Sequence, residues 1–227
     1  MRIDILTVVP TLLDSPFADS IIQRARDKGV VNIRVHDIRD WSKDKHKKVD
    51  DEPFGGIAGM VMTIQPILDA IKDLQSDCVY GEIIYLTPDG EQLKQARVNQ
   101  LSISGNLLII CGHYKGIDQR LRDHVVTLEL SIGDYVLSGG ELAAAVLTDA
   151  VVRLLPGAIG DEQSALTDSF QDDMLAPPVY TRPANYNGWE VPEILRSGDH
   201  AAIEKWMEEQ AYKRTMERRP DLLKKDS

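Results

Sequence analysis

The chain has 227 residues and a formal net charge of −10, a length that suits one large domain or a main domain with a small second one. It has only two cysteines, no apolar run of the ~18 residues that a membrane helix needs and no signal-peptide pattern. We therefore expect a cytoplasmic protein without membrane association or a disulfide framework. The acidic balance argues against a general nucleic-acid coat, although specific RNA binding needs only a local basic surface.

Basic residues concentrate in two stretches that could form such a surface. The first comprises Lys43, Lys45, His46, Lys47 and Lys48, and the second comprises Lys213, Arg214, Arg218, Arg219, Lys224 and Lys225. By composition alone, a solvated charged face of the fold is the better explanation of each stretch.

The first part of the chain predicts an α/β architecture. Residues 2–9 are apolar enough for a central strand of a parallel sheet. The pair Ser15-Pro16 is typical of a helix start, and this helix is expected to end at Gly29. Residues 30–35 alternate between apolar and polar and predict a second strand. Strand, helix and strand in this order favour a parallel sheet.

The same alternation continues after a polar, glycine-containing loop at residues 40–59. A loop of this length inside a compact domain is usually functional or mobile. Apolar periodicity then predicts helices at residues 64–74, 91–101 and 140–155, strands at 83–87, 107–111 and 125–130, and a turn at Pro88-Asp89-Gly90.

Three loops therefore follow three strands of the predicted parallel sheet: Thr87–Gly90, Gly112–Gly116 and Ser131–Gly140. Ligands of open parallel sheets bind beyond the carboxyl ends of the strands, so we expect these loops to converge on one pocket. The sequence has neither a dinucleotide-binding glycine fingerprint nor a P-loop.

The C-terminal part predicts a small helical domain. Residues 161–176 are polar and read as a flexible linker, residues 177–188 as an extended stretch, and residues 191–196 and 199–218 as helices, the second capped by Asp199 and carrying Ile203, Trp206 and Met207 on one face. We predict a first domain at 1–160, a linker at 161–176 and a helical domain at 177–227.

Five segments, in order and at matching spacing, resemble the bacterial tRNA (guanine-N1)-methyltransferases, the TrmD family of the SPOUT class. Ser131–Glu141, Ser-Ile-Gly-Asp-Tyr-Val-Leu-Ser-Gly-Gly-Glu, resembles the family's cofactor loop. The others are Val49–Gly56, Cys111–Asp118, Tyr180–Pro183 and Arg218–Leu222. The resemblance spans the chain and implies a SPOUT-type sheet tied in a deep trefoil knot, and a homodimer whose active sites combine residues of both subunits.

The resemblance also implies the cofactor and its contacts. The methyl donor would be S-adenosylmethionine, with magnesium assisting the reaction at a site that the sequence does not identify. The residues expected to bind the donor are Tyr85, Leu86, Thr87, Pro88, Gly112, Tyr114, Ile132, Gly133, Asp134, Tyr135, Val136, Leu137, Gly139 and Gly140. Without the resemblance, Tyr85, Leu86 and Ile132 would read as plain core residues.

The implied reaction is methylation of N1 of guanosine 37 of tRNA, next to the anticodon. Asp168 matches the family's general base and Arg153 the arginine that stabilises charge on the guanine O6. Their alternatives are a linker carboxylate and a surface helix charge. Phe170, Tyr180, Tyr186 and Trp189 could stack on RNA bases or pack the small domain.

Two departures from the family pattern leave rival functions open. His113 and Lys115 stand where the family most often has arginine and glutamate, and Ile57-Ala58 replaces Gly-Pro in a glycine loop. A non-catalytic tRNA-binding relative, or a SPOUT enzyme that acts on another RNA or base atom, are the alternatives. The presence of Asp168 and Arg153 weighs against the first.

Overall fold

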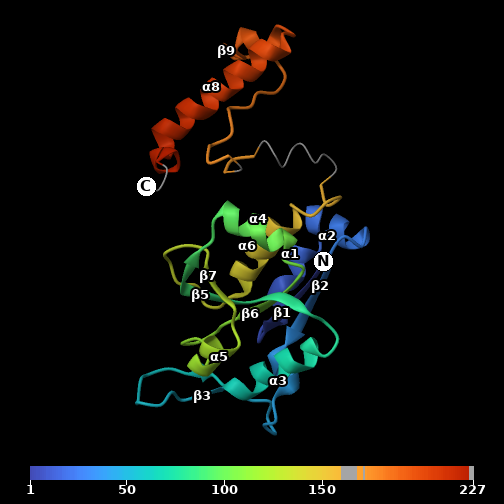
Figure 1. Ribbon diagram of the computed structural model, residues 1–227, viewed down its shortest axis with the longest axis vertical. Coiled ribbons are helices and arrows are strands. Elements are labelled where there is room, and N and C mark those ends of the chain that lie inside the picture. The colour runs from blue at the N-terminus through green and yellow to red at the C-terminus, as the bar shows by residue number, and fades with distance from the viewer. Residues whose placement is uncertain (160–167, 171, 225–227) are drawn as a thin grey trace. The chain divides into compact units, whose positions relative to one another are not determined.

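The computed structural model describes residues 1–159, 168–170 and 172–224 (Figure 1). The chain divides into two compact units, Met1–Glu162 and Gln163–Ser227. No helix of the described part is long and apolar enough to cross a membrane.

The first unit is built on one five-stranded sheet in the order β2-β1-β6-β5-β7. All neighbouring strands pair in parallel, which confirms the predicted α/β class. The strands are β1 (Arg2–Thr7), β2 (Asn32–Asp37), β5 (Tyr80–Gln92), β6 (Asn106–Cys111) and β7 (Leu128–Ser131).

Helices cover both faces of this sheet (Figure 1). On one face lie η1 (Pro10–Leu13), α1 (Asp14–Phe17), α2 (Ser20–Asp27), α4 (Gln95–Ile103) and α6 (Glu141–Val152), and on the other η2 (Ile38–Trp41), α3 (Ile64–Gln75) and α5 (Gln119–His124). Successive side chains of β1 point to opposite faces of the sheet and pack in both layers. Ile3 and Ile5 belong to one buried cluster, and Leu6 belongs to the other. A short hairpin, β3 (Asp50–Asp51) with β4 (Val61–Met62), closes the long loop predicted at residues 40–59.

The helix predicted from Ser15 to Gly29 is interrupted. Ser15-Pro16 lies inside the one-turn helix α1, and α2 starts only at Ser20. The side chain of Asp19 caps α2 by accepting a hydrogen bond from the Ser20 N–H at 2.6 Å. Asp19, and not Ser15, is therefore the N-cap residue of the helix that carries the buried residues Ile22 and Ala25.

The turn predicted at Pro88-Asp89-Gly90 is wrong, because β5 continues through it to Gln92. Leu86 and Glu91 both align with Leu130 of β7, so the intervening residues form an irregularity within the strand. A Cβ at Gly90 would lie 2.6 Å from the Leu130 nitrogen. Glycine is needed at this position because the backbones of β5 and β7 approach each other closely. A glycine after Pro-Asp is also typical of a turn, which explains the wrong prediction.

Other boundaries moved by a few residues. The strands predicted at 30–35 and 125–130 are found at Asn32–Asp37 and Leu128–Ser131. Two helices are shorter than predicted: α4 starts at Gln95, and α6 ends at Val152. Helix and strand ends depend on pairing partners that periodicity does not reveal.

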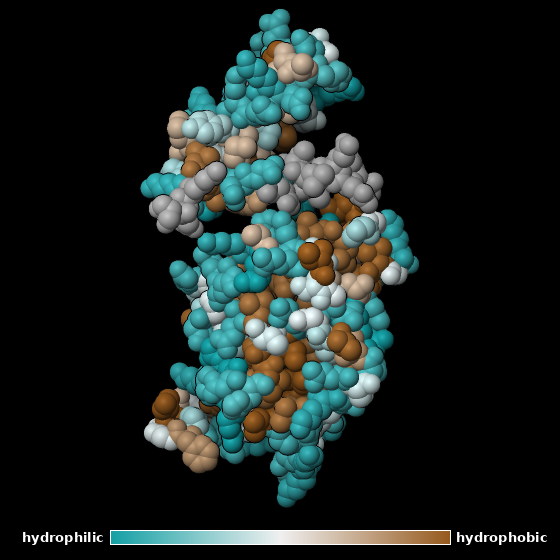
Figure 2. Space-filling model, in the orientation of Figure 1, coloured by the Kyte–Doolittle hydropathy of each residue, from teal (hydrophilic) through white to brown (hydrophobic). Residues whose placement is uncertain are grey.

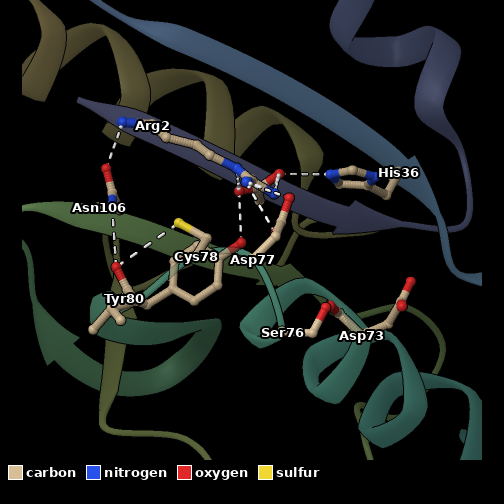
Figure 3. A network of polar contacts seen from close by, with 10 residues as sticks. Arg2, His36, Asp73, Ser76, Asp77, Cys78, Tyr80 and Asn106 are labelled. Atoms are coloured by element: carbon tan, nitrogen blue, oxygen red, sulfur yellow. Dashed lines mark hydrogen bonds and ion pairs between the residues drawn. The ribbon is translucent and has the colours of Figure 1, made fainter.

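A buried charge network lies on one face of the sheet, on β1 and its neighbours (Figure 3). Asp4 is fully buried, and its carboxylate accepts hydrogen bonds from Arg2 Nε at 2.5 Å and from the Tyr80 hydroxyl at 2.6 Å. His36 Nε2 lies 2.7 Å from the second carboxylate oxygen. Burial works to raise the pKa of Asp4, yet these hydrogen bonds outweigh it and lower the pKa below its ordinary value.

The second unit centres on α8 (His200–Arg218), which the Asp199 side chain caps through the Ala202 N–H at 3.1 Å, as predicted. The helix predicted at 191–196 is a 3₁₀ turn, η3 (Glu193–Arg196), and a second such turn, η4 (Pro220–Leu223), follows α8. Antiparallel strands β8 (Asn185–Tyr186) and β9 (Trp189–Glu190) form a hairpin at the end of the predicted extended stretch and just beyond it. On α8, Ile203 and Trp206 are partly buried, but Met207 is exposed.

The predicted domain boundaries stay predictions. Residues 160–167 and 171, which include much of the linker predicted at 161–176, lie outside the described residues. The rest of that linker, residues 168–170 and 172–176, contains no helix or strand.

Candidate functional site

One pocket of about 300 Å³ lies at the carboxyl ends of β6 and β7, beside the residues Tyr85–Pro88 within β5. It is lined by Tyr85, Leu86, Thr87, Pro88, Gly112, His113, Tyr114, Lys115, Gly116, Leu130, Ser131, Ile132, Gly133, Tyr135, Val136, Leu137, Ser138, Gly139, Gly140 and Ala143. All three predicted segments therefore contribute to one pocket, although Thr87 and Pro88 belong to strand β5 and not to a loop. Each residue expected to bind the cofactor lines the pocket except Asp134, which is exposed nearby.

Tyr85 forms a buried part of the pocket wall. Its ring is 3% exposed, and a Cβ at Gly112 would lie 2.9 Å from it, so glycine makes room for the ring. The Arg122 guanidinium lies 5.4 Å from the ring centroid and pairs with Asp89 at 2.8 Å and Glu129 at 2.6 Å. Burial raises the pKa of Tyr85. Tyr85 is thus a neutral, firmly packed side chain that supports the pocket wall.

The loop Ser131–Gly140 bends at Gly133, whose φ is +152°. Ser131 Oγ accepts a hydrogen bond from the Gly133 N–H at 3.2 Å and donates one to the Gly133 carbonyl at 3.0 Å. The Tyr135 N–H donates to the same carbonyl at 2.8 Å. This tight bend carries Tyr135, Val136 and Leu137 with exposed side chains along the pocket.

The loops Gly112–Gly116 and Ser131–Gly140 are joined directly. The Gly140 N–H donates to the Gly112 carbonyl at 3.0 Å, and His113 Nε2 lies 2.7 Å from Glu141 Oε1. The Thr7 hydroxyl donates to the same Glu141 oxygen at 2.5 Å. Glu141 is 1% exposed, so this partnered carboxylate ties the pocket rim to the end of β1.

Glycine at position 139 makes the contact between these loops possible. A Cβ there would lie 2.3 Å from His113 Nε2 and 2.5 Å from Glu141 Oε2. His113 occupies the position where the family pattern most often has arginine, and its ring places a nitrogen next to the buried carboxylate.

Lys115 lies on the pocket rim beside the long loop. Its backbone N–H donates to the Met60 carbonyl at 3.0 Å. Its aliphatic chain runs against Gly59, where an added Cβ would meet Lys115 Cγ at 3.0 Å. The glycine loop that departs from the family pattern at Ile57-Ala58 is therefore a neighbour of the pocket.

The two predicted catalytic residues lie in different units. Arg153 is the C-cap of α6 in the first unit and is partly exposed. Asp168 belongs to the second unit and is also partly exposed. Their assigned roles stay predictions.

Cys111 ends β6 beneath the pocket and is fully buried. Burial, reinforced by the nearby Glu141 carboxylate, raises the pKa of its thiol well above the ordinary value. A protonated thiol is a poor nucleophile, so Cys111 is a packing residue of the strand end. The described residues contain no group of three or more histidines, cysteines and carboxylates that could hold a metal ion.

Both basic stretches are partly paired with carboxylates, and in the second Arg219 pairs with Asp221 at 2.7 Å. In the first, Lys43 pairs with Asp69 at 2.7 Å, and Lys47 pairs with Asp40 at 3.1 Å. A stretch whose charges are partly neutralised within the fold offers less net attraction to phosphate.

Comparison with known proteins identifies the family. Residues 1–225 match the family model described as tRNA (Guanine-1)-methyltransferase TrmD. The chain belongs to this family. Among curated relatives, a protein of Flavobacterium psychrophilum is 61% identical over 223 residues, which cover 98% of this chain and 99% of the relative. Relatives from Bacteroides fragilis (59% identical, 98% and 99% covered) and Porphyromonas gingivalis (56%, 99% and 100%) are similar over comparable lengths. All three are named tRNA (guanine-N(1)-)-methyltransferase.

TrmD membership confirms the resemblance read from the motifs, but sequence reasoning missed several pocket residues. Ser131 and Ser138 lie within the glycine loop, and Ala143 lies one helical turn after Gly140. These positions adjoin predicted residues and could have been found by their spacing. The hydrogen bond between Thr7 and Glu141 joins residues 134 positions apart, so a local sequence pattern could not predict it.

Proposed function

We propose that this TrmD-family chain uses S-adenosylmethionine to methylate N1 of guanosine 37 of tRNA. The observation that carries the proposal is the pocket: the residues that the family resemblance assigns to the methyl donor surround one cavity at the carboxyl edge of the sheet. The names of relatives at 56–61% identity support a tRNA guanine-N1 methyl transfer.

The pocket fits the chemistry of the donor. Its volume of about 300 Å³ is at the lower end of the ~300–1,000 Å³ of small-molecule sites. Apolar side chains such as Leu86 and Ile132 can enclose the adenine, and the glycines leave backbone N–H and C=O groups within its reach. S-adenosylmethionine, when bound, supplies an electrophilic methyl group on its sulfonium.

Asp168 and Arg153 would act on the guanine. N1 of guanine carries a proton that must leave as the nitrogen attacks the methyl group, and Asp168 would accept that proton. A carboxylate is a weak base, so the charge that develops on O6 needs stabilisation at the same time, which the Arg153 guanidinium would provide.

A homodimer with composite sites accounts for the placement of these groups on separate units. Leu142 and Val146 are one turn apart on α6 and are 54% and 49% exposed, next to η1, whose Leu12 is 48% exposed. Exposed apolar side chains that gather on one face favour a protein interface. Figure 2 shows brown, apolar surface between the polar areas of the first unit.

The second unit suits RNA binding. Tyr186 and Trp189 of the β8–β9 hairpin are 60% and 75% exposed, with ring centroids 6.5 Å apart. Such exposure favours stacking on bases over packing of the small domain. Lys213 and Arg218 of α8 are exposed basic residues that could contact phosphates.

Three further features of the proposal come from the resemblance. These are the deep trefoil knot around the cofactor loops, a role of magnesium in the reaction, and action in the cytoplasm, where tRNA is modified. The backbone bond between Gly140 and Gly112 joins the two loops that such a knot would bring together.

The deciding experiment is mass spectrometry of tRNA nucleosides after incubation with the protein and S-adenosylmethionine. We expect 1-methylguanosine at position 37, and its loss in Asp168→Asn. A methyl group on another atom or nucleotide would indicate a different SPOUT activity. Binding of tRNA without any methylation would identify a non-catalytic relative, the function that His113 and Lys115 left open.

A further inference from the structure

The described residues around Asp168 are folded against the C-terminal end of α8. The Leu175 N–H donates to Thr215 Oγ1 at 2.9 Å, and the Ala176 N–H donates to Ser169 Oγ at 2.9 Å. Thr215 is fully buried, and its hydroxyl donates to the Ala211 carbonyl of the same helix at 2.7 Å. The described residues 169–170 and 174–176 are thus hydrogen-bonded to one another and attached to α8 through the buried Thr215 hydroxyl.

Phe170 adds a strained backbone to this turn. Its φ is +74°, which is a genuine outlier for a bulky residue and persists only where the surroundings hold it. Its N–H donates to the Met174 carbonyl at 2.7 Å. The Arg219 guanidinium lies 5.7 Å from the Phe170 ring centroid and is itself held by Asp221 at 2.7 Å.

Arg219 and Asp221 belong to the motif Arg218–Leu222, and the proposed function assigns no task to either of these two residues. We propose that Thr215 and Arg219 are positioning residues for Asp168: they hold the turn that follows it, and thereby the carboxylate, without touching the substrate. The inference rests on the proposed role of Asp168 as general base.

The size of the expected effect follows from the geometry of proton transfer. A general base must lie within hydrogen-bond reach of the proton that it accepts, and a misplacement of ~1 Å can lower the rate ~10²-fold. Thr215→Val preserves the shape of the side chain and removes the acceptor for Leu175. We expect it to lower the single-turnover methylation rate, at saturating tRNA and S-adenosylmethionine, ~10- to 100-fold.

Thr215→Ser keeps the hydroxyl and should restore most of the rate. Met216→Leu is the matched control, because Met216 is the next residue of α8 and is 53% exposed. Its rate should equal that of the wild type. Dissociation constants for S-adenosylmethionine should be unchanged in all three variants, since the proposed donor pocket lies in the first unit.

Arg219→Gln tests the second contact on an exposed residue, where loss of folding is not expected. A positioning role lowers the rate at saturating tRNA, whereas a phosphate contact weakens tRNA binding and leaves the saturated rate intact. Each variant is also combined with Asp168→Asn. If Thr215 and Arg219 act through Asp168, they produce no further loss in that background.

The outcomes separate the two proposals. Full activity of Asp168→Asn overturns the assignment of the base. Loss of activity in Asp168→Asn, together with wild-type saturated rates in Thr215→Val and Arg219→Gln, overturns the positioning role alone. Additive losses in the double variants also refute it, because they show that the residues act independently of Asp168. If Thr215→Val does not fold, the Arg219→Gln rate and its double variant decide the question.

Discussion

Replacement of Gly133 by valine tests whether the pocket binds S-adenosylmethionine. The φ of +152° at Gly133 is unfavourable for a β-branched residue. An added Cβ would lie 2.5 Å from Tyr135 Cε1, but Tyr135 is 54% exposed and its ring can move away. Backbone strain is therefore the larger penalty.

This strain is worth ~1–3 kcal/mol. The free loop relieves it by adopting another backbone conformation, and binding must then restore the strained one. Since ~1.4 kcal/mol is a tenfold change in a dissociation constant, we expect Gly133→Val to weaken S-adenosylmethionine binding by ~5- to 150-fold, as measured by isothermal titration calorimetry. Circular dichroism should show an unchanged fold.

Gly105→Val is the matched control. Gly105 also has a positive φ, +86°, and an added Cβ there meets no atom within 4 Å. It precedes β6 at the amino end of that strand, whereas the pocket lies at the carboxyl end. This variant should lose thermal stability and keep its affinity. Unchanged affinity in Gly133→Val would refute the pocket assignment, and equal losses in both variants would point to general destabilisation.

Three further outcomes are expected. If active sites combine two subunits, mixing an Asp168→Asn chain with a Gly133→Val chain restores one working site per mixed dimer; mixed dimers without methylation count against this. Lys115→Glu lowers kcat or raises the KM for tRNA more than Lys115→Ala, because it reverses the charge at the pocket rim; a glutamate variant faster than the wild type contradicts an adapted pocket. Asp4→Asn lowers the free energy of unfolding near neutral pH by about 3 kcal/mol, because it breaks a buried, paired carboxylate. The folded pKa of Asp4 is lowered, so its contribution to the free energy of unfolding is present above pH ~4 and is lost as the pH falls through the folded pKa. Denaturant titrations should therefore show that the stability difference between the wild type and the variant shrinks in acid. A stability difference that does not change with pH argues against this linkage.

Local patterns were enough to predict the fold class and the place of the pocket. Apolar runs at residues 2–9 and 107–111 require burial on both faces of a sheet, and glycine-bounded loops follow the strands that end at the pocket. These properties depend on a few neighbouring residues, so they are readable without a structure. The family motifs then indicated which loop residues face one another.

Apparent local signals failed where a distant partner overruled them. Pro88-Asp89-Gly90 has the composition of a turn, yet pairing with β7 keeps it in a strand, and Gly90 serves the approach of Leu130. Ser15-Pro16 resembles a helix start, but the long helix begins beyond Asp19, whose side chain forms the cap. Propensity is a weak prior that tertiary contacts override.

The sequence by itself determined the main strands and helices of the sheet and which loops carry the glycines, because these follow from the spacing of side chains along a regular backbone. Only the tertiary structure decided that Glu141 contacts both Thr7 and His113. The same holds for the buried Asp4, which contacts Arg2, His36 and Tyr80. It also holds for Thr215, whose hydroxyl accepts a hydrogen bond from the Leu175 N–H. Each of these groups needs partners from elements far apart in the chain, since a buried polar atom must be paired wherever the packing places it.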